Sequence, residues 1–111
     1  MTATTEVADD TDKAVLALAR RMRRHVVRMA ANPEGAHVGG SLSCVDILAV
    51  LYSGVLRVDP VRPDWPERDR FVLSKGHASA ALYAALAERG FLATAELDSY
   101  VMPDSRLGGH P

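Results

Sequence analysis

Cysteine and aromatic residues are scarce in this 111-residue chain, which has one Cys, two Phe, one Trp and three Tyr. A single thiol, Cys44, cannot form an internal disulfide, and without a cysteine cluster there is no cysteine-based zinc site. A disulfide-stabilised secreted domain is therefore excluded, and a reducing, cytoplasmic location is expected. With so few aromatic residues, the core must be mainly aliphatic.

The sequence also lacks a long apolar run and an excess of charge. Asp46 interrupts the longest apolar region, so we expect no membrane-spanning helix. Thirteen basic and 14 acidic residues give a formal net charge of −1, which argues against a dedicated nucleic-acid-binding protein. The arginines between residues 20 and 28 leave a nucleic-acid face as an alternative. A solvated or subunit-facing helix is favoured, because no aromatic residue is interleaved to stack on bases.

Length and composition fit one domain. Residues 1–10 are expected to form a flexible leader that lacks the pattern of a signal peptide, and residues 11–111 to belong to the domain itself. Apolar residues with helical periodicity predict a helix over about 12–31, which Asn32-Pro33 ends. A glycine-rich loop, residues 34–40, follows.

The rest of the chain alternates short elements with turns. The expected elements are a nearly all-apolar helix to about residue 53 with Ser43 and Asp46 as its capping pair, a proline-rich loop over 59–69, a buried strand over 70–74, a helix over about 78–89 capped by Gly90, and a short helix over about 95–101. A lone strand must pair with others. We therefore expect the N-terminal portion of a parallel α/β domain, mostly helical over the residues present. A short all-helical domain is the alternative if the apolar run at Phe71 is not a strand.

Three of the four histidines lie in glycine-flanked loops: His37, His77 and His110. Glycine lets the backbone approach a ligand closely, and histidine adds a group that can change charge near neutral pH. The Lys75-Gly76-His77 turn connects the expected strand to a helix, whose N-terminus favours an anion such as a diphosphate. An ordinary strand-to-helix turn and a three-histidine metal site are the alternatives. The metal site is disfavoured because no two of these histidines are close in sequence.

These motifs, in this order, resemble the opening of transketolases. The matching runs are AHVGGSLS (36–43), DIL (46–48), LY (51–52), DP (59–60), PDW (63–65), RDRFVLSKGHAS (68–79), LY (82–83) and GGHP (108–111). The Ser-Lys-Gly-His-Ala form is most similar to the N-terminal subunits of split, two-gene transketolases.

The resemblance implies an enzyme that uses thiamine diphosphate and Mg²⁺ to transfer a two-carbon ketol unit between sugar phosphates. It implies that His77, with Gly76 and Ser79, binds the cofactor diphosphate. It also implies that His37 and His110 are catalytic and line the substrate channel. One departure is the loop Gly-Ala-His-Val-Gly at His37, where the family often has Ser-Gly-His-Pro-Gly.

Two motifs of the family do not occur in these 111 residues: the Gly-Asp-Gly motif that binds Mg²⁺, and the glutamate that activates the cofactor. We therefore expect the chain to be inactive alone and to be completed by further polypeptide or by a complementary C-terminal, pyrimidine-binding subunit in a homo- or hetero-oligomer. The alternatives are a non-catalytic remnant or interaction module, and another thiamine-diphosphate enzyme acting on a sugar-like substrate.

Overall fold

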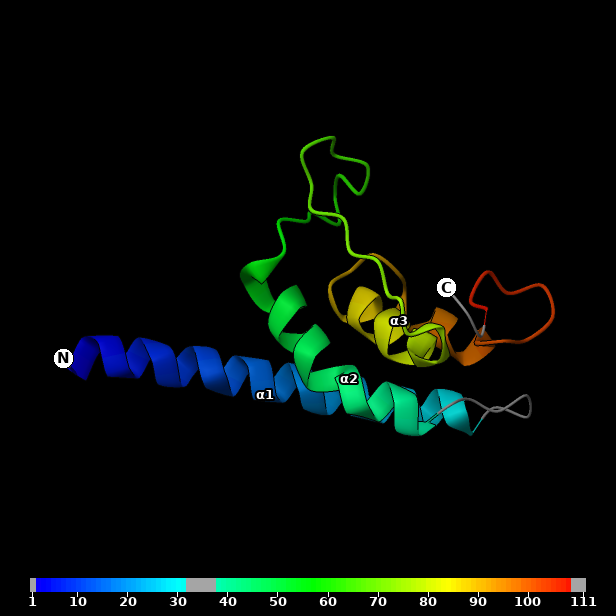
Figure 1. Ribbon diagram of the computed structural model, residues 1–111, viewed down its shortest axis with the longest axis horizontal. Helices are drawn as coiled ribbons and strands as arrows, with labels where there is room; N and C mark the ends of the chain where they lie inside the picture. The colour runs from blue at the N-terminus through cyan, green and yellow to red at the C-terminus, as the bar shows by residue number, and fades with distance from the viewer. Residues whose placement is uncertain (1, 32–37, 109–111) are drawn as a thin grey trace.

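The computed structural model describes residues 2–31 and 38–108. Its elements, in chain order, are α1 (Thr2–Ala30), α2 (Val38–Val50), the π-helical turn η1 (Leu51–Val55), the 3₁₀ turn η2 (Gly76–Ala78), α3 (Ser79–Glu88) and the 3₁₀ helix η3 (Thr94–Ser99). α1 is the longest helix, and its N-terminal part extends past the other elements (Figure 1). α2 and α3 pack against α1 and against each other.

The start of α1 differs from the prediction. We expect the helix from about residue 12, but it begins at Thr2, so residues 2–10 form its first turns and not a leader outside it. Neither glycine nor proline occurs between Thr2 and Ala30, so nothing in this stretch opposes helical hydrogen bonding. The end of the helix at Ala30 lies within one residue of the prediction.

The start of α2 is also a correction. The helix begins at Val38, so Gly40 lies in its first turn and not in the predicted loop. Ser43 lies inside the helix, where its hydroxyl donates to the Gly40 carbonyl at 2.8 Å. Asp46 instead accepts a 2.6 Å hydrogen bond from Arg23 of α1. The predicted capping pair is therefore wrong, because the helix already begins at Val38 and Ser43 does not lie at its N-terminus.

The segment Val38–Val55 is long and apolar enough, by length and composition alone, to cross a membrane, although we expect Asp46 to prevent this. In the structure this segment packs against both α1 and α3. A helix that is buried between neighbours is apolar on several sides for that reason. This packing accounts for part of its apolar composition only, because Ile47, Val50 and Val55 remain exposed.

The strand predicted over residues 70–74 is absent, and no strand occurs within residues 2–31 and 38–108. Val72 is 82% exposed, and Phe71 packs edge-on against Tyr52 of η1 with ring centroids 6.1 Å apart. A strand requires a hydrogen-bonding neighbour, which no described segment provides. The expected parallel sheet is therefore not part of the described residues, which are mostly helical as predicted.

The core lies where α1, α2 and α3 meet. Met22 and Val26 of α1 and Val45 and Leu48 of α2 are almost completely buried there. α3 contributes small residues, namely Ala80, Ala81, Ala84 and Ala85, all fully buried. Because the distance between packed helices depends on the side chains between them, these alanines let α3 lie close to its neighbours. This packing holds both η2 and α3 against α2.

The end of α3 agrees with the prediction. The helix ends at Glu88, and Gly90 adopts a φ of +90°, a conformation that residues with a side chain rarely adopt. The amide of Phe91 then donates to the Leu86 carbonyl at 2.9 Å. The last predicted helix is present as the shorter 3₁₀ helix η3.

Candidate functional site

Two segments that are far apart in the sequence meet at the first turn of α2. A methyl group placed on Gly40 would lie 3.6 Å from the carbonyl oxygen of His77 and 3.6 Å from Cε of Lys75. The Lys75-Gly76-His77 turn therefore lies directly against the start of α2. Glycine leaves room for this approach, because a larger side chain would have to displace the turn.

Two consecutive hydrogen bonds link these segments. Nζ of Lys75 donates to the Ser43 hydroxyl at 2.6 Å, and that hydroxyl donates to the Gly40 carbonyl at 2.8 Å. The partner of Lys75 is a neutral hydroxyl, so no carboxylate cancels the ammonium charge within this link. Lys75 and His77 are both exposed to solvent.

The same turn leads into α3. The amide of Ala78 donates to the Lys75 carbonyl at 3.0 Å, which closes the turn before the helix. The N-terminus of α3 has a partial positive charge from the helix dipole. An exposed lysine and an exposed histidine next to this helix end favour an anionic ligand such as a diphosphate.

The predicted cofactor-binding residues differ in their exposure. His77 is exposed, Gly76 is half-buried, and Ser79 is completely buried at the first position of α3. The hydroxyls of Ser79 and Tyr100 share a hydrogen bond of 2.9 Å. Ser79 therefore connects α3 to the segment after η3, whatever it does toward a ligand.

His37 and His110, the predicted catalytic residues, lie outside the described residues, and their roles stay predictions. His37 immediately precedes α2 in the sequence. Gly108, two residues before His110, accepts a 2.9 Å hydrogen bond from the Tyr83 hydroxyl of α3. The described segments next to both histidines are thus attached to the three-helix core.

Tyr83 and Tyr100 form a buried aromatic pair beneath the site. Their rings meet edge to face, with centroids 5.9 Å apart. Burial raises the pKa of Tyr83 above its ordinary value, and the nearby Tyr100 raises it further, although the hydrogen bond to Gly108 opposes both effects. The Tyr83 phenol therefore stays protonated near neutral pH and remains a donor to Gly108.

Sequence reasoning missed Ser43 as a partner of Lys75 and Tyr100 as a partner of Ser79. It also missed Ser41, which is fully buried in α2 and has no hydrogen-bond partner for its hydroxyl within the described chain. A signal for Ser41 exists in the sequence. Together with Val45, Leu48 and Tyr52 it follows helical spacing, which marks the buried face once the helix starts at Val38.

Neither a reactive thiol nor a metal ion is supported at the contact between α2 and the Lys75-Gly76-His77 turn. Burial raises the pKa of the Cys44 thiol above its ordinary value, although the positive charge of Lys75 acts in the opposite direction. The thiol is therefore protonated and weakly reactive near neutral pH. The described residues hold no group of three His, Cys, Asp or Glu side chains that could share a metal ion. The alternative three-histidine site falls partly outside them, at His37 and His110.

Comparison with known proteins gives a specific match. The family described as "Transketolase, thiamine diphosphate binding domain" matches residues 12–111. The chain is 53% identical over 74 residues to the 6-deoxy-6-sulfo-D-fructose transketolase subunit of Clostridium sp. (strain MSTE9), across 67% of this chain and 27% of that protein. It is 40% identical over 89 residues to an apulose-4-phosphate transketolase subunit of Phocaeicola vulgatus, across 80% of this chain and 32% of that protein.

The similarity extends to a human protein. The chain is 42% identical over 93 residues to the transketolase of Homo sapiens, across 84% of this chain and 15% of the human protein. In these three alignments the chain spans at most 32% of the length of the curated relative.

Proposed function

The chain belongs to the family of transketolase thiamine diphosphate binding domains, and from this we propose that it forms the diphosphate-binding part of an enzyme that transfers a two-carbon ketol unit between sugar phosphates. Relatives that are named transketolases or transketolase subunits support this proposal. Since those relatives are much longer, the activity would belong to the complete enzyme.

The contact between the Lys75-Gly76-His77 turn and Gly40 carries the proposal. This contact brings an exposed lysine and an exposed histidine beside a residue that has no side chain. Two groups that can carry positive charge, next to a helix N-terminus, fit the charge of a diphosphate. The residues present therefore fit the cofactor at its diphosphate end.

We assign His77 and Gly76 to the diphosphate, with Ser79 as the third predicted cofactor-binding residue. When bound, thiamine diphosphate supplies a nucleophilic carbon and an electron sink. His37 and His110 would bind substrate hydroxyls and move protons near the reacting carbon. Loss of either imidazole is expected to lower turnover by about 10²–10⁴-fold.

The remaining parts of the enzyme are assigned to polypeptide outside these 111 residues. We propose that the ligands of Mg²⁺ and a complementary, pyrimidine-binding subunit complete the active site, since two of the relatives above are named subunits. The complete enzyme would be an oligomer that acts on sugar phosphates in the cytoplasm.

The test is a titration of thiamine diphosphate, with Mg²⁺ present, against the chain assembled with its complementary subunit. We expect His77→Ala to weaken cofactor affinity by roughly 10- to 150-fold, the equivalent of one hydrogen bond to a charged group. Turnover at saturating cofactor should change less. Arg70→Ala is the matched control, because Arg70 is an exposed cation on the same segment whose guanidinium binds the Arg68 and Pro66 carbonyls.

Two results would contradict the proposal. Unchanged cofactor affinity in His77→Ala would remove this histidine from the diphosphate. Robust ketol transfer by the 111-residue chain alone would show that no complementary polypeptide is needed.

A further inference from the structure

The part of the chain that leads to His110 is held at two successive carbonyl groups. The carbonyl of Leu107 accepts a 2.8 Å hydrogen bond from the amide of Val101, and the carbonyl of Gly108 accepts one of 2.9 Å from the Tyr83 hydroxyl. The first bond closes a loop whose ends are Val101 and Leu107. The second is different, because its donor is a side chain of α3. Tyr83 therefore ties the last described residue to the helical core.

The loop that ends at Leu107 has a defined shape. Val101 and Asp104 adopt φ angles of +53° and +69°, in the left-handed region that residues with a side chain rarely adopt. Such angles persist only where surrounding contacts hold them. Here the Leu107 amide donates to the Ser105 hydroxyl at 3.0 Å, and the Leu107 side chain is buried. Because this loop is fixed, the hydrogen bond from Tyr83 acts on the next residue at a defined place.

Tyr83 itself is fixed within α3. Its ring is almost fully buried and meets the Tyr100 ring edge to face, with centroids 5.9 Å apart. Tyr83 lies one turn after Ser79, the first residue of α3, and α3 directly follows the turn that carries His77. Because the rise of a helical turn is fixed at about 5.4 Å, the two sites keep a constant separation along the helix. One short helix thus connects the predicted diphosphate-binding turn with the chain before His110.

We propose that Tyr83 is a positioning residue, whose hydroxyl holds the Gly108 carbonyl so that His110, two residues further on, stays at a constant distance from the diphosphate. This inference rests on the proposed function, in which His110 moves protons near the reacting carbon and His77 contacts the diphosphate. Proton transfer requires a close approach of donor and acceptor, so displacing the imidazole by up to about 1 Å costs roughly 10- to 100-fold in rate. In this role Tyr83 touches neither substrate nor cofactor.

The Tyr83 hydroxyl can be removed with little effect on packing. Its partner Gly108 is exposed to solvent, so water replaces either group when the bond is lost, and the bond adds little to stability. The ring, which packs against Tyr100, is retained in phenylalanine. Tyr83→Phe therefore removes the positioning contact and leaves the core intact.

The test is a double-mutant cycle in the chain assembled with its complementary subunit. It measures ketol transfer at saturating thiamine diphosphate with Mg²⁺ present. We expect Tyr83→Phe to lower turnover by roughly 10- to 100-fold, while the affinity for thiamine diphosphate changes by less than about threefold. In the His110→Ala background the same substitution should change turnover by less than about twofold, because no imidazole is left to position.

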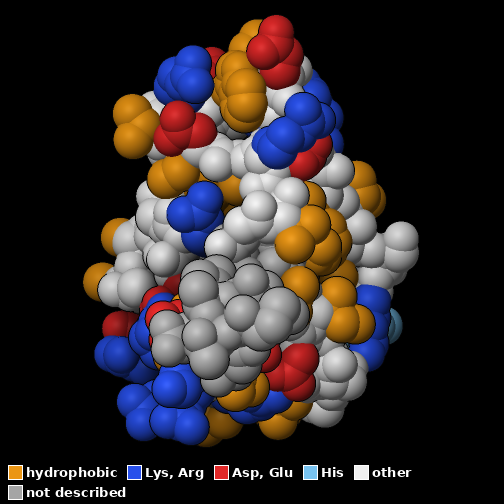
Figure 2. All heavy atoms as spheres, turned by 90° about the vertical axis from the view of Figure 1, so that its left-hand side faces the viewer, with side chains coloured by type: hydrophobic (Ala, Val, Ile, Leu, Met, Phe, Trp, Pro, Cys, Tyr) orange, Lys and Arg blue, Asp and Glu red, His pale blue; other side chains and the backbone are white. Residues whose placement is uncertain are grey.

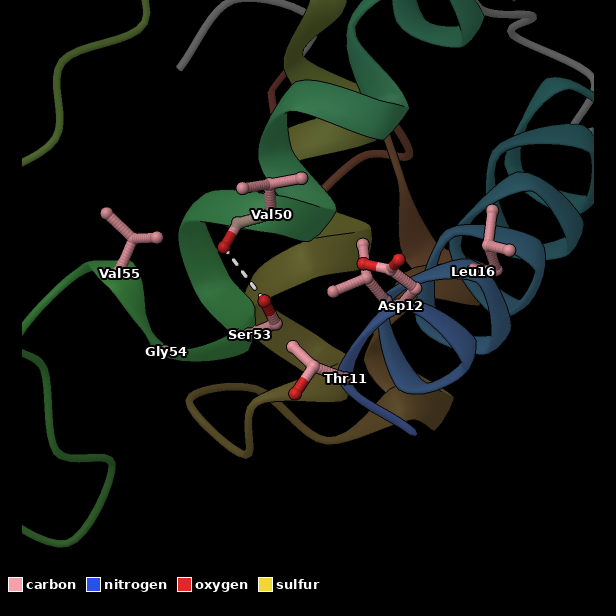
Figure 3. Close-up of a pocket in the computed structure, with 8 residues that line it drawn as sticks. Thr11, Asp12, Leu16, Val50, Ser53, Gly54 and Val55 are labelled. Carbon is pink, nitrogen blue, oxygen red and sulfur yellow. Dashed lines mark hydrogen bonds between the residues drawn. The ribbon is translucent and has the colours of Figure 1, made fainter. Parts of the chain in front are cut away.

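Tyr52→Phe is the matched control. It makes the same substitution in a buried tyrosine whose ring also has an edge-to-face partner, Phe71, at 6.1 Å. Tyr52 lies in η1, which in Figure 1 is at the opposite side of the molecule from the segment after η3. Figure 2 looks onto the η1 side and shows hydrophobic side chains between charged ones at the top and at the lower edge. There Ser53, Gly54 and Val55 of η1 line a cavity of about 490 Å³ beside α1 (Figure 3).

Amide hydrogen exchange of the assembled enzyme gives a readout that does not depend on activity. The peptide of residues 101–110 should exchange faster in Tyr83→Phe than in the wild type, and at the wild-type rate in Tyr52→Phe. Tyr52→Phe should also keep the wild-type turnover.

Three results would overturn the inference and leave the proposed function standing. They are equal turnover in Tyr83→Phe and Tyr52→Phe, an undiminished effect of Tyr83→Phe in the His110→Ala background, and unchanged exchange of residues 101–110. Wild-type turnover in His110→Ala would instead contradict the role of His110 in the proposed function, and the inference would fail with it.

Discussion

Lys75 and Ser43, 32 residues apart in the sequence, are joined by a 2.6 Å hydrogen bond from the ammonium group to the hydroxyl. The bond connects the turn before α3 to the body of α2. The backbones of the same two segments approach at Gly40 and His77. These contacts fix the turn that carries His77 relative to the start of α2, which directly follows His37 in the sequence.

Loss of this hydrogen bond should therefore weaken cofactor binding without removing a positive charge. We expect Ser43→Ala to reduce the affinity for thiamine diphosphate by about 3- to 10-fold, the equivalent of one neutral hydrogen bond. Lys75→Met should cause a larger loss, because the charge also disappears. Calorimetric titration of the assembled enzyme measures both effects.

Ser53→Ala is the control for this prediction. Its hydroxyl donates to the Val50 carbonyl at 2.8 Å, the same kind of contact that Ser43 makes with Gly40. Ser53 lies in η1, beyond the far end of α2, so the loss of its hydroxyl should leave cofactor affinity unchanged. Equal effects in Ser43→Ala and Ser53→Ala would mean that the link to Lys75 does not position the turn.

The two glycines at the start of α2 should tolerate substitution differently. A methyl group on Gly39 meets no atom within 4 Å, so Gly39→Ala should stabilise the chain by up to about 1 kcal/mol through helix propensity. The larger side chain of Gly40→Val would press on His77 and Lys75 and should lower both thermal stability and cofactor affinity. Thermal unfolding and titration of the two variants separate these effects. A destabilised Gly39→Ala with an unaffected Gly40→Val would contradict the packing described.

The features that the sequence predicts well are local ones. The end of α3 depends on Gly90, whose positive φ is a property of glycine itself. The end of α1 and the positions of the His77 turn and α3 also agree with local signals. The family, too, is recognisable from short runs of sequence, because each run contains characteristic residues and the runs follow one another in the same order as in transketolases.

The predictions that were wrong concern features that depend on residues far away in the sequence. Asp46 follows Ser43 at the spacing of a capping pair, but the helix begins earlier, at Val38, and Asp46 binds Arg23 of another helix. The apolar run at Phe71 has the composition of a strand, yet no described segment pairs with it, and Val72 remains exposed. Ser43 and Lys75 could not be connected from the sequence for the same reason. Thirty-two residues separate them, and only the packing of α2 against the turn brings them together.

Glu88 should make stability depend on pH in the acidic range. Its carboxylate accepts hydrogen bonds from Arg21 at 2.6 Å and His25 at 2.7 Å. Burial raises the pKa of Glu88, but these two partners outweigh burial and hold the pKa below its ordinary value near 4.5. A lowered pKa stabilises the fold above the unfolded value, and this contribution is lost as the pH falls through the folded value. The melting temperature should therefore drop below about pH 4.5.

Glu88→Gln tests this interpretation. We expect it to lower the free energy of unfolding at pH 7 by about 1–3 kcal/mol, because charged hydrogen bonds are lost, and to flatten the acidic pH dependence. Asp98→Asn is the control, since its ion pair with Arg28 is exposed on both sides and should contribute under about 1 kcal/mol. Calorimetric melting across pH 3–7 measures both variants. An unaltered pH profile in Glu88→Gln would assign the acid sensitivity to other groups.

Ser79 and Tyr100 allow the structural and the cofactor-binding roles of one hydroxyl to be separated. Both side chains are almost fully buried and share a 2.9 Å hydrogen bond. Tyr100→Phe removes the hydrogen bond but keeps the Ser79 hydroxyl. Ser79→Ala removes both the hydrogen bond and the Ser79 hydroxyl. Each should destabilise the fold by about 1–2 kcal/mol, because a buried hydrogen bond is lost.

The two variants should differ in their affinity for thiamine diphosphate. If Ser79 binds the cofactor as we predict, Ser79→Ala weakens affinity beyond the effect of Tyr100→Phe at equal loss of stability. Thermal unfolding first establishes that the stability losses match, and titration then compares the affinities. Identical affinities would restrict Ser79 to joining α3 to the segment after η3, and the predicted diphosphate contacts would be those of Gly76 and His77 alone.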